Sequence, residues 1–241
     1  MRIAIFSDIH ANLPALEAVL EHIRGQSFDA VYCLGDLVGY APFPNEVTGR
    51  IRREQIPTIM GNYDDGVGFD RDDCGCAYRE PDEKLRGDQS LAWTRAHVTA
   101  DNKAFLRELP HEIRFEADTK RILLVHGSPR KINEYLFEDR AISSFQRLAA
   151  SSNADIIVFG HTHKPYTKLV DDVLFLNVGS VGKPKDGDRR SCYAILDTSV
   201  PEARFVRVEY DLATATAAIR HSELPHEFAA DLERGGAPTK P

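Results

Sequence analysis

Five short polar motifs follow one another along this chain, and most of them come directly after an apolar run. They are Asp8-Ile9-His10, Gly35-Asp36, Gly61-Asn62-Tyr63-Asp64, His126-Gly127 and Gly160-His161-Thr162-His163. Short apolar runs rich in branched residues are typical of buried strands. Open α/β sheets place their ligands beyond the carboxyl ends of such strands. The motifs therefore predict one polar site at one edge of a sheet.

The motifs supply a set of potential metal ligands that contains no thiolate. The set comprises Asp8, His10, Asp36, Asn62, His126, His161 and His163. Carboxylate, imidazole and amide donors suit two divalent ions of hard to borderline character, with one carboxylate shared between them. Each motif alone is weak evidence, because a single histidine more often makes an ordinary polar contact. It is the ordered set that indicates a metal site.

Length and charge limit the remaining classes of function. The 241 residues favour one domain, or one domain with a small appendage. The net charge of −7 argues against an extended nucleic-acid-binding surface, but bound divalent ions would still permit a nucleotide substrate. Asp8 interrupts the first apolar run, and no stretch approaches the roughly 20 apolar residues of a membrane span. We therefore expect neither a signal peptide nor a membrane partner.

The cysteines do not form a recognisable framework. Cys33, Cys74, Cys76 and Cys192 are too few and too unevenly spaced to staple a chain of this length. Cys74-Gly75-Cys76 has no second pair of Cys or His nearby that would complete a zinc knuckle. We expect reduced thiols and a cytoplasmic protein.

The first part of the chain alternates between strand and helix patterns. We expect strands at 3–6, 30–34 and 57–60, with a helix through 13–23 capped by Asn12 and another near 45–53. This β-α-β-α-β order is typical of a parallel sheet. Residues 64–87 are polar and rich in glycine, and we expect a long loop over the site. Two short helices should follow, capped by Asp88 and Thr99.

The second half reads mainly as strands, many of them in hairpin-like pairs. We expect strands at 113–116, 121–125, 155–159, 165–170, 173–177, 192–197 and 203–209, with a helix at about 139–150. Helices from Leu212 to Arg220 and after Pro225 would complete the chain. We therefore expect a main domain at 1–210 and a helical extension at 211–241. The apolar side chains of that extension would cover the core or form a homodimer contact.

The ordered motifs resemble those of the calcineurin-like metallophosphoesterases, whose pattern is D-x-H, G-D, G-N-H-[DE], H and G-H-x-H. The matching motifs span residues 8–163. The compact length is similar to that of the small bacterial and archaeal phosphodiesterase branch. The resemblance implies an α/β fold in which two facing mixed β-sheets are flanked by helices, an αββα sandwich.

The resemblance also implies how the ligands are shared. One metal would take Asp8, His10, Asp36 and His163. The other would take Asp36, Asn62, His126 and His161, so that Asp36 bridges. The family uses manganese, iron, zinc, cobalt or nickel, of which we favour manganese, and imidazole-rich sites fit these ions better than magnesium. A hydroxide bridging the two ions would attack a small phosphoester or nucleotide directly.

Tyr63 departs from the family pattern, which most often has His at this position. That His normally helps to protonate the leaving group and is oriented by the following acid, here Asp64. A phenol is a poor general acid at neutral pH, although it can donate a hydrogen bond to a phosphate oxygen. The alternative is that Tyr63 only packs beside the site. We assign Asp36, Asn62, Tyr63 and Asp64 to catalysis and expect good leaving groups to be favoured.

Further residues near the motifs are candidates for substrate contacts, and each has a structural alternative. Asn12 could reach a phosphate or only cap its helix, and Tyr40 could stack on a base or only pack locally. Ser128 could offer a hydroxyl or only form a turn before Pro129. Arg189 could meet a second phosphate or remain a solvated charge.

Three functions remain open from the sequence. The leading one is a dinuclear metal phosphodiesterase. The second is a phosphomonoesterase, including a protein phosphatase. The third is a scaffold or adaptor that keeps the fold and has lost catalysis. All potential ligands are present, which favours an enzyme, whereas the replaced His at position 63 is the feature that supports a scaffold.

Overall fold

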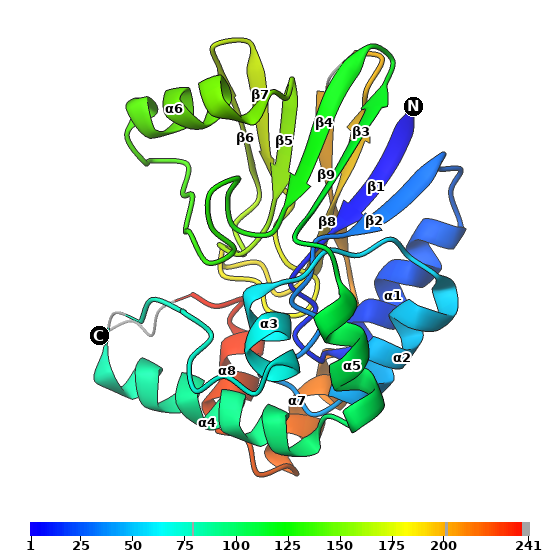
Figure 1. Cartoon of the computed structure of the whole chain (residues 1–241). Coiled ribbons are helices and arrows are strands. Elements are labelled where there is room, and N and C mark those ends of the chain that lie inside the picture. Colours follow the sequence, from blue (N-terminus) through cyan, green and yellow to red (C-terminus); the bar gives the residue numbers. More distant parts are fainter. Residues whose placement is uncertain (79, 201, 238–241) are drawn as a thin grey trace.

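The computed structural model describes residues 1–78, 80–200 and 202–237. Two β-sheets face each other in the upper part of Figure 1, and helices lie against their outer sides and below them. The expected αββα sandwich is therefore confirmed. Within the described ranges, no helix is long and apolar enough to cross a membrane.

The first sheet has the strand order β2-β1-β8-β9. Its strands are β1 (Arg2–Phe6), β2 (Ala30–Cys33), β8 (Ser191–Asp197) and β9 (Glu202–Val208). β1 runs parallel to β2, while β1 with β8 and β8 with β9 are antiparallel. The sheet is mixed because its central strand β1 pairs with an early strand on one side and a late strand on the other.

The second sheet has the order β3-β4-β5-β7-β6. Its strands are β3 (Glu112–Ala117), β4 (Lys120–Val125), β5 (Ile156–Phe159), β6 (Tyr166–Val170) and β7 (Val173–Asn177). The three central strands are parallel, and an antiparallel hairpin partner closes each edge. The expected hairpin pairs are confirmed, including the turn between β3 and β4.

Alternation along the strands explains why both sheets are covered on both faces. Successive side chains of a strand point to opposite faces. Ile3 and Ile5 join a cluster with Leu124 of the second sheet, in the space between the sheets. Ala4 and Phe6 belong instead to the cluster under the helices. A strand buried on both faces reads as a continuous apolar run, which is the pattern of β1.

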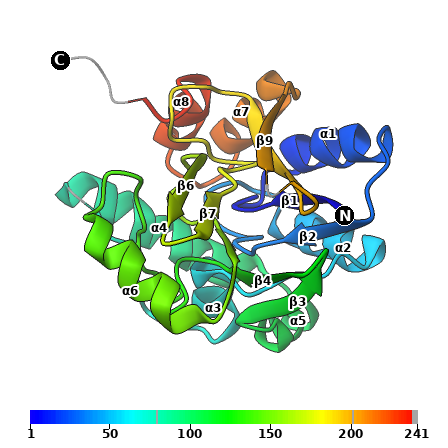
Figure 2. The ribbon, with the colours of Figure 1, turned by 90° about the horizontal axis from the view of Figure 1, so that it is seen from above.

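Helices cover the outer face of each sheet. The helices α1 (Leu13–Arg24), α2 (Pro44–Glu54), α7 (Leu212–Arg220) and α8 (Glu227–Glu233) contribute to the cluster on the first sheet. On the second sheet the covering helix is α6 (Ile142–Ser152). Viewed from above, α6 and α1 lie on opposite sides of the sandwich (Figure 2).

The C-terminal helices cover the chain's own core. Ile219, Leu224 and Phe228 are at most 5% exposed and belong to the same cluster as Leu16 and Val19 of α1. Burial of these side chains inside the chain accounts for the apolar pattern of the extension.

The expected loop at 64–87 is wrong. Helices occupy both of its ends, α3 (Asn62–Gly68) and α4 (Pro81–His97), and α5 (Ala100–Glu108) follows. Glycine is tolerated in α3 because Gly66 and Gly68 lie in close contact with neighbouring segments: a Cβ on Gly68 would lie 3.2 Å from Leu106. α4 begins with a proline and two acids, a favourable first turn. Asp88 lies inside that helix and does not cap it.

The expected strand at 57–60 is also wrong, since this segment forms only an isolated bridge between Cys33 and Thr58. Pro57 has no N–H to donate to a ladder. The segment is extended and is tied to β2 by two backbone hydrogen bonds, from Cys33 N to Pro57 O and from Ile59 N to Cys33 O. The early part of the chain therefore contributes two parallel strands rather than three.

Candidate metal centre

The motif residues follow strands of both sheets, so the prediction of a single sheet edge is wrong. Asp8 and His10 follow β1, and Asp36 follows β2 in the first sheet. His126 follows β4, and His161 and His163 follow β5 in the second sheet. The carboxyl ends of these strands meet near the middle of the molecule, above α3 in Figure 1. The site therefore spans the open edge of the whole sandwich.

The structure brings six of these side chains together as two buried triads. One triad is Asp8, His10 and His163, and the other is Asp36, His126 and His161. In each triad the three potential ligand atoms lie within 4.8 Å of one another. Each triad takes side chains from both sheets, so a cation bound in either would link the two sheets.

In the first triad the facing atoms are all acceptors. His10 Nδ1 lies 3.1 Å from the carbonyl of Val38, and His163 Nδ1 bonds the carbonyl of Lys183. A carbonyl only accepts, so each Nδ1 carries the proton and each Nε2 presents a lone pair. These two Nε2 atoms are 3.2 Å apart, and Asp8 Oδ1 lies 3.3 Å from that of His163.

The second triad repeats this arrangement with the amide of Asn62. His126 Nδ1 lies 2.7 Å from the carbonyl of Leu34, which leaves a lone pair on Nε2. That Nε2 lies 3.1 Å from Asn62 Oδ1 and 3.4 Å from Asp36 Oδ2. The Asn62 oxygen is identified by its Nδ2 group, which donates to the carbonyl of Cys74 at 3.0 Å.

These facing acceptors fit a pair of cations. Two buried acceptor atoms at hydrogen-bond distance repel unless a proton or a metal ion lies between them. Asp8 Oδ1 and His161 Nε2 are buried and have no hydrogen-bond partner among the described residues. Nitrogen and oxygen donors with backbone-fixed tautomers are the usual ligand shell of borderline divalent ions. The residues present therefore fit divalent metal ions, which the family pattern implies.

The protonation of the imidazoles differs between the triads. Burial lowers the pKa of His10 to about 3, which keeps its ring neutral. Burial also opposes the charged form of His126, but the adjacent Asp36 carboxylate outweighs it and raises the pKa of His126 to about 10. The pKa values of His161 and His163 are lowered, first by burial. With no cation bound, this raised pKa favours a second proton on His126 Nε2, facing Asp36 Oδ2, and a bound cation would displace that proton.

Left-handed backbone marks the ligand loops. Asp8, His10, Asp36, His161 and His163 all have φ between 49° and 63°. Non-glycine residues seldom adopt this conformation because it costs free energy. It persists only where the surrounding structure enforces it, often at functional sites. Here the surrounding structure is a set of backbone hydrogen bonds between loops, such as His10 N to Asp36 O at 2.9 Å.

The motif glycines allow the loops to approach each other closely. A Cβ on Gly61 would collide with the backbone nitrogen and carboxylate of Asp36. A Cβ on Gly160 would collide with Ser7 and with Asp8 Oδ2. The glycines of the motifs thus lie where one ligand loop touches the next.

Asp64 holds these loops together. Its carboxylate accepts hydrogen bonds from the backbone N–H groups of Asp36, Leu37 and Gly61 at 2.8 to 2.9 Å. Burial and the neighbouring Asp36 charge raise the pKa of Asp64 to about 7, while these N–H donors oppose the rise. The side chain is fully buried and oriented toward the backbone. Asp64 is therefore a positioning residue, which holds the loops that carry the metal ligands.

Tyr63 is packed against the first triad. Its ring is 1% exposed and lies edge-on to His10, with centroids 5.5 Å apart, and tilted against Tyr40 at 4.8 Å. A Cβ on Gly39 would collide with this ring. The Tyr63 hydroxyl is buried without a hydrogen-bond partner of good geometry among the described residues. Burial raises the pKa of the phenol, so it stays protonated.

The candidate substrate residues of the sequence take different positions. Asn12 caps α1 by accepting from Ala15 N at 3.3 Å and donates to Gly182 O at 3.0 Å, so its side chain bonds within the fold. Ser128 forms a turn, accepting from the backbone of Arg130 and Lys131.

Tyr40 and Arg189 lie in different surroundings. Tyr40 is 9% exposed and lies edge-on to His10, with ring centroids 4.9 Å apart. Arg189 is exposed and lines a surface hollow with Glu209 and Arg220, which contains no residue of the two triads. Tyr40 is therefore brought to the centre, and Arg189 is not.

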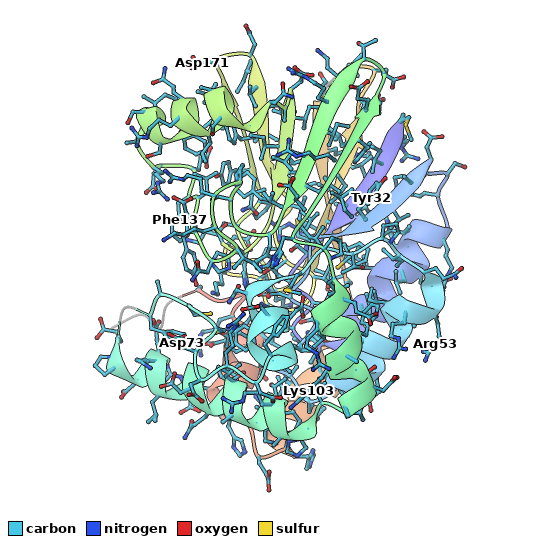
Figure 3. The ribbon with its side chains drawn as sticks, in the orientation of Figure 1. Tyr32, Arg53, Asp73, Lys103, Phe137 and Asp171 are labelled. Carbon is cyan, nitrogen blue, oxygen red and sulfur yellow. The ribbon has the colours of Figure 1, made fainter. Side chains whose placement is uncertain are left out.

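The connecting segment, residues 69–78 and 80 between α3 and α4, lies within the range expected to form a loop over the site, but none of its residues was predicted to contact the ligands. The amide of Asn62 donates to Cys74 O at 3.0 Å and to Cys76 Sγ at 3.2 Å. The Tyr78 hydroxyl lies 3.5 Å from that of Tyr40. In Figure 3, Asp73 marks this segment, and Phe137 marks the loop after β4 across from it. The polar, glycine-rich composition of this segment did not allow these contacts to be predicted.

A sixth polar motif follows β7 and was missed as a part of the site. Asn177 donates to Gly160 O at 2.7 Å, and the Ser180 hydroxyl donates to Asp8 O at 2.8 Å. Asn177-Val178-Gly179-Ser180 comes directly after an apolar run, as the five motifs do. That shared placement is the signal that would have found it. These residues hold the backbone of the ligand loops.

Lys183 was also missed, and it places a positive charge beside the first triad. Its Nζ lies 4.6 Å from the ring centroid of Tyr40, and its backbone carbonyl holds His163. Burial, followed by repulsion from Lys185, lowers the pKa of Lys183 to about 8. The signal in the sequence is Lys183-Pro184-Lys185, shortly after Gly179-Ser180.

Comparison with known proteins agrees with this geometry. The family model for the calcineurin-like phosphoesterase superfamily domain matches residues 1–200. An uncharacterized protein of Methanocaldococcus jannaschii is 34% identical, with 92% of this chain and 93% of that protein covered. The phosphodiesterase YfcE of Escherichia coli is 27% identical, with 83% and 89% covered. The structure of a metallophosphoesterase from Sphaerobacter thermophilus matches with a TM-score of 0.79 and 30% identity, covering 98% of this chain and 99% of that one.

Proposed function

The chain belongs to the calcineurin-like phosphoesterase superfamily, and from this premise we propose that it is a dinuclear metal-dependent phosphodiesterase. The observation that carries the proposal is the pair of buried triads in which lone pairs and carboxylate oxygens face each other. Such a site is costly without cations. The similarity to a protein named as a phosphodiesterase supports diesters as the substrate class.

The ligand assignment follows from the two triads. Asp8, His10 and His163 would hold one ion, and His126 and His161 the other, with Asn62 completing the second set. Asp36 would bridge, because Asp36 Oδ2 lies 3.6 Å from His10 Nε2 and 3.4 Å from His126 Nε2. We propose manganese as the native metal among manganese, iron, zinc, cobalt and nickel.

When bound, the ions would supply Lewis acidity toward the phosphoester oxygens and lower the pKa of a water molecule. The chain's residues provide the rest. The backbone-bonded Nδ1 atoms of His10, His126 and His163 leave each Nε2 free to bind an ion, and the Asp64 carboxylate holds the Asp36 and Gly61 loops together. This preorganisation means that little reorganisation is needed when charge develops on the phosphoryl group.

Protonation of the leaving group is the weak step of this site. Tyr63 stands where the family has a histidine, and its buried phenol keeps its proton. A leaving group that departs without protonation is therefore favoured, which points to aryl or other acidic leaving groups. The ammonium group of Lys183, which lies over the ring of Tyr40 and 3.8 Å from Asp231 Oδ2, adds a cation that would attract an anionic substrate.

The location in the cell is part of the proposal. All four cysteines are free, including Cys74 and Cys76, which lie close enough to react. Free thiols at such a distance are expected in a reducing compartment. We propose that the protein is cytoplasmic.

Hydrolysis of bis-p-nitrophenyl phosphate and p-nitrophenyl phosphate with manganese tests the proposal. We expect diester turnover that a chelator removes and that Asp36→Asn lowers by at least about a hundredfold, since metal ligands matter at least as much as their supporting residues. A matched control is Asp101→Asn, which changes an exposed acid on α5. Faster hydrolysis of the monoester would replace the proposal with a phosphomonoesterase. Absence of turnover with bound metal would leave the scaffold function.

A further inference from the structure

Cys74 and Cys76 bring two sulfur atoms together beside the metal centre. Their Sγ atoms are 3.1 Å apart. Cys74 is 8% exposed, and Cys76 is partly exposed. The other two cysteines, Cys33 and Cys192, are fully buried. Neither the proposed hydrolysis nor the metal ligand set uses the pair.

The turn between the two cysteines is built to hold the sulfurs on one side. Gly75 has φ +69°, a conformation that favours glycine. Its N–H donates to Asp73 Oδ1 at 2.7 Å, and its carbonyl accepts from Asn133 Nδ2 at 3.2 Å. The side chain of Asn133 fills the space that a Cβ on Gly75 would need. Contacts of the turn with Asp73 and Asn133 therefore keep the two sulfur atoms close together.

The pair also touches the metal centre through one amide. Asn62 Nδ2 donates to Cys74 O and to Cys76 Sγ, while its Oδ1 faces His126 Nε2. An amide offers two N–H donors and one oxygen. With both donors directed toward the cysteine turn, the oxygen is directed toward the second triad. The position of Asn62 therefore depends on the geometry of the cysteine pair.

We propose that Cys74 and Cys76 are a reversible oxidation site, whose intramolecular disulfide weakens metal retention at the second triad through Asn62. The effect on metal rests on the proposed function. The formation of the disulfide does not depend on that function.

Hydrogen peroxide is the oxidant that the step requires. The Cys76 sulfur attacks a peroxide oxygen, the O–O bond breaks, and water leaves as the sulfur becomes a sulfenic acid. The Cys74 sulfur then attacks that sulfur, the S–O bond breaks, and a second water leaves as the S–S bond forms. Two thiols lose two electrons and two protons, and the peroxide is reduced to two waters. A dithiol reductant reverses the change by exchange.

The disulfide changes the contact with Asn62. The sulfurs must move from 3.1 Å to about 2.05 Å, and the dihedral angle of the new bond must approach about 90°. A one-residue spacing leaves little freedom for this, so the turn at Gly75 must shift. The Asn62 amide then loses the acceptor geometry that aims its oxygen at His126.

Peptide mapping tests the first part without reference to activity. Trypsin should release residues 72–79 as one peptide that contains both cysteines. After treatment with hydrogen peroxide, we expect this peptide to take up no iodoacetamide and to regain two alkylation sites after reduction with dithiothreitol. Cys192→Ser is the control variant, because it removes a buried thiol and leaves the pair intact. A peptide that stays fully alkylated would overturn the proposal.

Manganese retention and diester hydrolysis test the second part in the full chain. We expect peroxide to lower both by about tenfold or more, in the range found for residues that support metal ligands, with recovery in dithiothreitol. Each variant is compared with its own untreated sample. Cys74→Ser should lose the peroxide response, whereas Cys192→Ser should keep it.

The outcomes separate the two proposals. A disulfide that forms while manganese retention stays unchanged would overturn the coupling through Asn62. Loss of manganese from Cys74→Ser in peroxide, equal to that of the unaltered chain, would also overturn it. If untreated protein binds manganese but hydrolyses no phosphoester, the proposed function fails, and mapping with manganese retention still decides on the oxidation site.

Discussion

The strand-end loops and the connecting segment border the same metal centre but are held in place differently. Backbone hydrogen bonds hold the loops to one another, among them Asp8 N to Gly35 O at 3.0 Å and Gly160 N to His126 O at 2.9 Å. The connecting segment is held chiefly by side chains, such as Asn62 to Cys74 O and Asn133 to Gly75 O. The ligands are therefore fixed by the fold, whereas the surroundings of Asn62 depend on which side chains are present.

The largest effect should come from filling the contact between two ligand loops. Gly61→Ala forces a Cβ into Asp36, so we expect a loss of about 2–3 kcal/mol in the free energy of unfolding and of manganese binding. Gly49→Ala in α2 is the control, because its Cβ meets only Arg53 Nη1 at 3.5 Å. Urea denaturation and calorimetric titration measure the two effects. Equal behaviour of the two variants would contradict the account of the loops.

A smaller effect should follow from weakening the carboxylate that ties the loops. Asp64→Asn keeps the size of the side chain but turns one acceptor into a donor that faces backbone N–H groups. We expect a loss of about 1–3 kcal/mol in stability and about 10- to 100-fold in metal affinity. Denaturation and metal titration test both. Unchanged metal affinity would show that Asp64 does not position Asp36.

On the connecting segment the expected effect is smaller again. Asn133→Ala removes the hydrogen bond to Gly75 O, which is partly buried. We expect a loss of about 1 kcal/mol or less in the free energy of unfolding and a change in manganese affinity below about tenfold. The comparison with Asp64→Asn uses the same titration. An effect on metal binding larger than that of Asp64→Asn would reverse the ranking of the two regions.

Substitutions at Tyr63 test which leaving groups the site favours, rather than how its loops are held in place. Tyr63→His restores the family residue beside His10, and we expect the ratio of alkyl to aryl ester hydrolysis to rise severalfold, because an imidazole is a better acid near neutral pH. Tyr63→Phe removes a buried hydroxyl that has no hydrogen-bond partner of good geometry among the described residues, and it should leave the ratio unchanged. An unchanged ratio in Tyr63→His would mean that position 63 only packs.

The smallest effect should lie at the opposite end of the second sheet. Asp155 precedes β5, and its bonds with Arg121 lower the pKa of its carboxyl to about 2. Because this pKa is below the unfolded value of about 3.9, the stabilisation is complete above about pH 5 and is lost as the pH falls toward 2. Asp155→Asn should slightly lower the melting temperature at pH 7 but not near pH 2. Metal affinity should not change; a change would contradict the separation of the two ends.

The sequence allowed the ligand residues and the sandwich to be predicted because both leave local patterns. Asp8 and His161 each follow an apolar run whose burial on both faces is visible in its composition. The assignment of motifs to one sheet edge failed because strand pairing between distant segments leaves no local pattern. The helix at Asn62 was missed because Gly66 and Gly68 lower helix propensity, and their packing against neighbouring segments restores it.

The contact between Cys76 and Asn62 could not be predicted either, because it depends on residues that are far apart in the sequence. The turn at Gly75 depends on Asn133, which is far along the chain and carries no motif. The bridging position of Asp64 between three backbone N–H groups likewise requires the folded loops. Residues that position the metal-binding side chains were harder to predict than those side chains, because the positioning residues bond to backbone groups.

An anomalous difference map from crystals grown with manganese would show whether the centre holds two ions. We expect two peaks in each chain, one among Asp8, His10 and His163 and one among Asp36, His126 and His161. Their separation should be about 3.5–4 Å, with Asp36 between them. A single peak, or none, at saturating manganese would contradict a dinuclear centre.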